Sequence, residues 1–158
     1  EVNFEEALWT IPALKMKGRR DHMVPLSTQA MAILREAHQL TGDGRYIFPS
    51  TRSASRPMSD MTLSAALKRL SYDSDTHTMH GFRASARTML EEQLKVRPEL
   101  LEHQLAHTVK GPLGRAYNRT TLLDERREMM QRWANYLDEL KKPQADNVAP
   151  TPSPLRLP

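Results

Sequence analysis

The sequence contains no cysteine, and it has no long run of apolar residues. Without cysteine the chain cannot form a disulfide scaffold, a thiolate zinc site or a cysteine nucleophile. The ~20 consecutive apolar residues of a membrane-spanning helix are absent, and the charged start EVNFEEA does not resemble a signal peptide. We therefore expect a soluble cytoplasmic protein, and the length of 158 residues predicts one compact domain.

The positive charge of the chain is small and unevenly placed. The 23 Lys and Arg residues exceed the 19 Asp and Glu residues, for a formal net charge of +4. Residues 80–120 carry seven basic and four acidic side chains, whereas residues 121–142 carry five of each. This local excess indicates an anionic partner, and a solvated helical surface is the alternative.

The first part of the chain predicts a β-hairpin followed by a helix. Two extended segments, Phe4–Ile11 and His22–Leu26, flank a turn rich in charge and glycine, Lys17–Asp21. Ser27 is an N-cap for a helix that Gly42 ends. Its apolar residues recur at spacings of three and four, so we expect them to face the core: Ala30, Met31, Ile33, Leu34, Ala37 and Leu40.

The rest of the chain predicts a mainly α fold with the hairpin as a small antiparallel β element. We expect a loop over 45–57 with at most a brief strand at Tyr46–Phe48. Residues 143–158 contain five prolines and should form a flexible tail. Helical periodicity or capping predicts helices over 60–70, 81–94, from Pro98 to about 106, over 115–119 and over 121–142.

Five side chains are the candidates for chemistry: Lys17, His80, Arg83, His107 and Tyr117. Each alone has an ordinary structural explanation, since turn lysines are solvated and histidines often cap helices. His103 and His107 have the i, i+4 spacing of metal ligands, but no third ligand follows a known spacing. We find no glycine loop for a phosphate, so neither a metal nor another cofactor is predicted.

Together these residues resemble the catalytic domain of the tyrosine recombinases, the phage integrase family, and especially the integrases of prophages and genomic islands. The similar segments are LKMKGRRDHMVPLS, HGFRASARTML, LLEHQLAHTVKGPLGRAYNRT and ERREMMQRWANYLDEL. The family pattern has a lysine in a hairpin turn, a His-x-x-Arg pair, a histidine or tryptophan ending the next helix, and then a tyrosine. Residues 1–142 are thus expected to form part of that catalytic domain, with its fold.

The resemblance implies that DNA is cut and rejoined through a 3′-phosphotyrosyl link to Tyr117. A phosphodiester transition state needs positive hydrogen-bond donors, which Arg83 and His107 would supply. His80 would accept a proton or orient the phosphate, and Lys17 would protonate the leaving 5′ oxygen. The link conserves bond energy, so neither ATP nor a metal is required.

The family pattern also has a first arginine, in a Thr-Gly-x-Arg context before the hairpin, and this chain starts downstream of that position. We therefore expect a truncated domain that has little or no activity alone. The implied partners are double-stranded DNA, other protomers of a synaptic tetramer and accessory DNA-bending or directionality proteins, in the bacterial nucleoid. The predicted phosphate contacts are Arg19, Arg20, Arg87, Arg115 and Arg119.

Two other functions fit the same residues. The chain could be a DNA-binding or assembly module without catalysis, or an enzyme similar to a type IB topoisomerase, whose catalytic residues resemble those of the integrases. The helix over 121–142 suits docking either within its own chain or on a neighbouring protomer.

Overall fold

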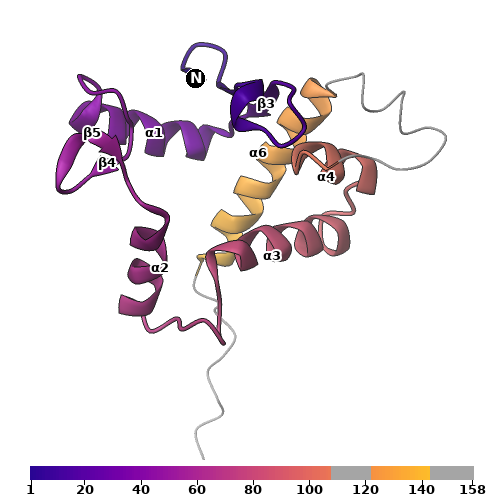
Figure 1. Cartoon of the computed structure of the whole chain (residues 1–158). Coiled ribbons are helices and arrows are strands. Elements are labelled where there is room, and N and C mark those ends of the chain that lie inside the picture. The colour runs from indigo at the N-terminus through magenta and orange to yellow at the C-terminus, as the bar shows by residue number, and fades with distance from the viewer. Residues whose placement is uncertain (108–121, 143–158) are drawn as a thin grey trace, which may run out of the picture.

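The computed structural model describes residues 1–107 and 122–142. This part of the chain contains five α-helices and two small antiparallel sheets (Figure 1), which confirms the mainly α prediction. The helices are α1 (Thr28–Thr41), α2 (Asp60–Arg69), α3 (Met79–Glu92), α4 (Pro98–Gln104) and α6 (Leu123–Leu140). No helix of these residues is long and apolar enough to cross a membrane.

The first sheet is built from the N-terminal residues in the order β1 (Val2–Asn3), β2 (Leu8–Ile11) and β3 (His22–Pro25). β2 and β3 form the predicted hairpin, with Ile11 opposite His22. The predicted strand over Phe4–Ile11 is wrong in its first half. Residues 4–7 turn instead, because Asn3 Oδ1 accepts the amides of Glu5 and Glu6 and Ala7 adopts a φ of 50°.

Helix α1 begins and ends where the sequence predicted. The Ser27 hydroxyl accepts the amide of Ala30 at 3.2 Å, and Gly42 is the C-cap. The predicted core-facing stripe is only partly correct: Met31 is buried, but Ile33 is 61% exposed and Leu40 is 84% exposed. Helix α1 contacts α6, and the Phe4 ring packs edge-on against His38 of α1.

The segment 45–57 differs from its predicted loop. It contains a second hairpin, β4 (Pro49–Ser50) and β5 (Ser53–Pro57), and the strands begin after Tyr46–Phe48. Helix α2 has the predicted extent but no buried residue, so its apolar face is exposed in this structure. Helical periodicity places the apolar side chains of α2 on one face, but none of them is buried by another described element.

The main core lies between α3, α4 and α6. Leu90 of α3, Leu100 and Leu101 of α4, and Met129 of α6 are buried together with Val96. Figure 1 shows α6 between α1 and α4, and α6 also contacts β3. In the structure, α6 therefore docks on its own chain. The predicted helix over 115–119 and the tail at 143–158 lie outside the described residues.

Side-chain amides fix the contact between α6 and α1. Gln131 Oε1 accepts the backbone amide of Thr28 at 2.9 Å, and Gln131 Nε2 donates to Gln29 Oε1 at 2.9 Å. Gln29 in turn donates to Asp138 at 2.8 Å. Gln131 thus also caps the first turn of α1, and these bonds hold α6 against α1.

Candidate active site

A cavity of about 590 Å³ opens between the sheet, α3, the end of α4 and α6. Lys17, Arg83 and His107 all line it, although the sequence separates them by as many as 90 residues. The apolar lining residues include Trp9, Leu90 and Trp133. Three of the five predicted chemical side chains therefore meet at one hollow of the surface.

Lys17 lies in a tight turn between β2 and β3. The 3₁₀ helix η1 (Ala13–Lys15) follows β2, and the amide of Arg19 then donates to the carbonyl of Met16 at 3.1 Å. This bond closes a turn whose central residues are Lys17 and Gly18. Among the described residues no ion pair reaches Lys17, so its ammonium group remains available at the rim of the cavity.

Arg83 and His80 come from the first turns of α3. Thr78 caps the helix, since its hydroxyl accepts the amide of Gly81 at 3.0 Å. A Cβ at Gly81 would meet the His77 ring at 3.0 Å, so a larger residue there would require this ring to shift. Arg83 lines the cavity, whereas His80 is exposed one turn earlier and is not part of the lining.

His107 owes its position to the way α4 ends. The amide of His107 donates to the Glu102 carbonyl at 2.8 Å, and the amide of Ala106 donates to His103 at 3.1 Å. These two bonds, with Ala106 at a φ of 54°, form a Schellman motif. The motif reverses the chain and turns the His107 side chain back toward α3.

A hydrogen-bonded chain links the side chains at this corner. Arg83 Nη2 donates to the Leu105 carbonyl and lies 3.1 Å from His107 Nε2. His107 Nδ1 lies 2.6 Å from Glu102 Oε2, and the other Glu102 oxygen accepts from Arg87 Nε at 3.0 Å. Partial burial would raise the pKa of Glu102, but the bonds from His107 and Arg87 outweigh it and hold that pKa below its ordinary value.

Sequence reasoning missed a second network behind the cavity. Arg126 of α6 is 1% exposed, and it donates to Gln104 Oε1 at 2.8 Å and to the Met23 carbonyl at 2.5 Å. Burial lowers the pKa of Arg126 to about 10. His22 lies 3.1 Å from the Gln104 carbonyl, and burial lowers its pKa as well. One sequence signal existed: Arg126 interrupts the stripe that includes Met129, Met130 and Trp133.

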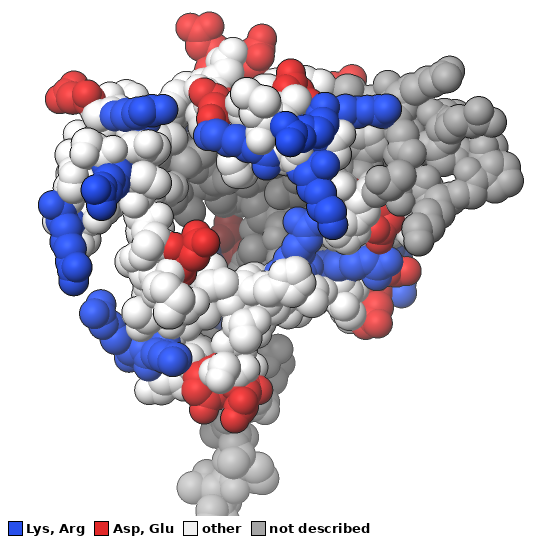
Figure 2. All heavy atoms as spheres, in the orientation of Figure 1, with Lys and Arg blue, Asp and Glu red and all other residues white. Residues whose placement is uncertain are grey.

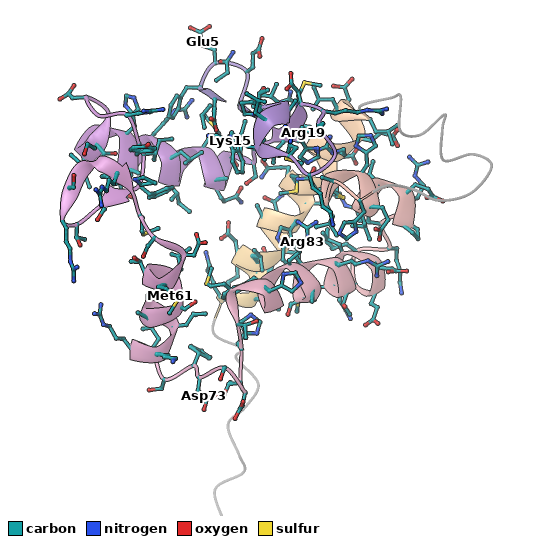
Figure 3. The ribbon with its side chains drawn as sticks, in the orientation of Figure 1. Glu5, Lys15, Arg19, Met61, Asp73 and Arg83 are labelled. Carbon is teal, nitrogen blue, oxygen red and sulfur yellow. The ribbon has the colours of Figure 1, made fainter. Side chains whose placement is uncertain are left out.

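Positive side chains gather on the face where the cavity opens. Figure 2 shows Lys and Arg side chains from the turn before β3 down to α3, beside a hollow, and Figure 3 places Lys15, Arg19 and Arg83 there. Arg19 and Arg20 are exposed, while Arg87 is paired with Glu91 and Glu102.

Tyr117, Arg115 and Arg119 lie outside the described residues. Within those residues, no three acidic or histidine side chains are grouped as metal ligands.

The chain is similar to proteins of one known family. The chain matches the phage integrase family over residues 1–136. It is 44% identical to the prophage integrase IntA of Escherichia coli (strain K12) over 135 residues, which cover 85% of this chain and 32% of that protein. It is 40% identical to the integrase of Enterobacteria phage P4 over 152 residues, 87% of this chain and 35% of that protein.

Another prophage integrase of Escherichia coli (strain K12), IntZ, is 40% identical over 139 residues, 88% of this chain and 34% of that protein. The chain thus spans about a third of the length of these relatives. No solved structure gives a significant match. The family match extends over the hairpin, the cavity and most of α6, and this chain belongs to the phage integrase family.

Proposed function

We propose that the chain supplies the phosphate-binding and strand-cutting residues of a site-specific DNA recombinase. The observation that supports this most directly is the meeting of Lys17, Arg83 and His107 at one cavity, from a turn, a helix and a helix end. An ammonium, a guanidinium and an imidazole around a hollow form a site for an anion such as a phosphodiester.

In the proposed reaction, Tyr117 attacks the scissile phosphorus and its phenolic proton passes to a base. The bond from phosphorus to the deoxyribose 5′ oxygen breaks, and the DNA keeps a 3′-phosphotyrosyl link. Arg83 and His107 donate to the non-bridging oxygens, where charge builds up in the transition state. Lys17 gives its proton to the departing 5′ oxygen, and His80 takes the phenolic proton or orients the phosphate. The new 5′ hydroxyl then attacks the phosphotyrosyl link of a partner strand.

Loss of Arg83 should slow the reaction strongly. Removing one preorganised donor from a developing oxyanion costs about 10²–10³ in rate, or ~2.7–4 kcal/mol. The 158-residue chain does not include the first arginine of the family pattern, so we propose that it cleaves DNA very slowly by itself. Residues 1–142 form the catalytic part in this proposal, and residues 143–158 a separate tail.

The proposed partners are duplex DNA, further protomers of a synaptic tetramer and accessory DNA-bending proteins, at the bacterial nucleoid. Phosphate contacts from Arg19, Arg20, Arg87, Arg115 and Arg119 would give binding that weakens steeply with salt. Arg87 would have to leave a carboxylate partner to make such a contact.

The test uses a chimera in which this chain replaces the matched region of the phage P4 integrase, so that the preceding residues are supplied. A nicked suicide duplex with the phage attachment site traps the covalent intermediate. We expect an adduct that peptide mass spectrometry assigns to Tyr117, no adduct from Tyr117→Phe, and an unchanged adduct from Tyr136→Phe as control. DNA binding without any adduct would instead support the non-catalytic module, and relaxation without strand exchange the topoisomerase.

A further inference from the structure

We propose that Glu102 is a positioning residue that holds the His107 ring and lets it carry positive charge when an anion enters the cavity. The inference rests on the proposed function, because it concerns how the same site meets a phosphate. It comes from the geometry of one corner of the cavity, where α3 and the end of α4 exchange hydrogen bonds.

The protonation state of His107 follows from its neighbours. A guanidinium has only donors, so the 3.1 Å contact between Arg83 Nη2 and His107 Nε2 requires Nε2 to accept. The ring proton is then on Nδ1, where Glu102 Oε2 accepts it at 2.6 Å. This geometry fits the neutral Nδ1–H tautomer of His107 in the anion-free site, with the Nε2 lone pair turned toward Arg83.

An anion bound at Arg83 would favour a second proton on the His107 ring. Once oxygen atoms of the anion take the Arg83 donors, a bare Nε2 lone pair would face negative charge, which is repulsive. A second proton on Nε2 converts that contact into a charge-assisted hydrogen bond. The imidazolium is then placed between the anion and the Glu102 carboxylate, and an opposite charge at this distance favours the charged ring.

Arg87 orients the Glu102 carboxylate toward His107. Its Nε donates to Glu102 Oε1 at 3.0 Å, which leaves Oε2 for His107, and its Nη1 donates to Glu91 at 3.0 Å. The side chain of Glu102 is 25% exposed, whereas that of Glu91 is 41% exposed. The charged or titratable groups around this corner of the cavity in the described residues are Arg83 and Arg87 of α3, Glu102 of α4, Lys17 of the turn and His22 of β3, while α6 presents Met130 and Trp133.

The experiment uses the 158-residue chain with its histidine rings labelled with ¹⁵N, and inorganic sulfate as the anion, because sulfate keeps one charge state over the pH range. Without sulfate near neutral pH, we expect His107 to show a protonated Nδ1 and a bare Nε2. With saturating sulfate, both nitrogens should be protonated. In Glu102→Gln, the ring should stay neutral under sulfate, and sulfate affinity should fall about tenfold.

The pH profile separates this role from a structural one. At low pH, where a histidine ring is charged without the help of a carboxylate, the affinity difference should shrink below about threefold. The matched control is Glu91→Gln, which loses the other Arg87 partner and should behave like the wild type. A tenfold loss at every pH, or an equal loss in Glu91→Gln, would overturn the proposal.

The wild-type ring spectrum keeps the proposal testable if Glu102→Gln fails to fold. A bare Nδ1 with a protonated Nε2 in the sulfate-free chain would refute it without any variant. These readouts need no DNA cleavage. Failure of Tyr117 to attach to DNA would therefore count against the proposed function, whereas the wrong tautomer would count against the role of Glu102 alone.

Discussion

Arg126 gives the sharpest test of how the site is supported, because it is a buried cation that donates, within the described residues, to Gln104 of α4 and to Met23 of β3. Arg126→Met keeps most of the side-chain volume but leaves the Met23 carbonyl and Gln104 Oε1 without this donor. A buried acceptor without a donor costs ~1–3 kcal/mol, so the two together cost ~2–6 kcal/mol. Relief of the desolvation that lowers the Arg126 pKa to about 10 offsets part of this cost.

The expected net loss of unfolding free energy is ~1–3 kcal/mol, or roughly 2–12 °C in Tm for a chain of this size. Urea unfolding followed by circular dichroism measures it, and an unchanged m value would show that the same surface is exposed on unfolding. The matched control is Arg127→Met, which removes an exposed bond to the Glu6 carbonyl at 2.9 Å and should cost under ~1 kcal/mol. An Arg126→Met protein as stable as the wild type would refute the assigned role of this network.

Three further outcomes follow from the structure. Ala106→Gly should raise the unfolding free energy by ~0.5–1 kcal/mol in urea titrations, because Ala106 has a φ of 54°, which glycine adopts without strain. Burial lowers the His22 pKa below 6.5, so the unfolded chain binds a proton before the folded chain does as the pH falls. The free energy of unfolding should therefore decrease as the pH falls below 6.5. His22→Gln should weaken this dependence of Tm on pH in melting curves. In the phage P4 chimera, Lys17→Ala should slow cleavage of a normal duplex about 10²–10⁴-fold. A duplex with a 5′-bridging phosphorothiolate has a leaving group that needs no acid, so it should restore most of the rate. Equal slowing on both substrates would exclude Lys17 as the acid.

Local sequence signals predicted the elements that local bonds define. Ser27, the predicted N-cap, accepts the amide three residues ahead, and α1 begins at the next residue. Thr78 caps α3 in the same way, but this helix was predicted to begin two residues later, at 81. The glycine and charge of the 17–21 segment predicted the turn that carries Lys17. These signals work because caps and turns depend on residues within a few positions of each other.

Signals that depend on a distant partner were missing or misleading. The apolar stripe of α1 predicted a buried face, but Leu40 is 84% exposed, since periodicity does not say whether another element covers a face. Glu102 and Gln104 carry no motif that marks them, and their roles arise only when α4 meets α3 and α6. His80, which the family pattern includes, stays a prediction, as does Tyr117.

The most direct measurement of the central claim is a crystal structure of this chain soaked with tungstate, a tetrahedral anion that anomalous scattering locates without bias. The account predicts one strong site in the cavity, with oxygens within hydrogen-bond distance of the Arg83 guanidinium and the His107 ring and with Lys17 turned toward them. Tungstate bound only at other exposed arginines, such as Arg52 and Arg56 of the second hairpin, with the cavity empty, would contradict it.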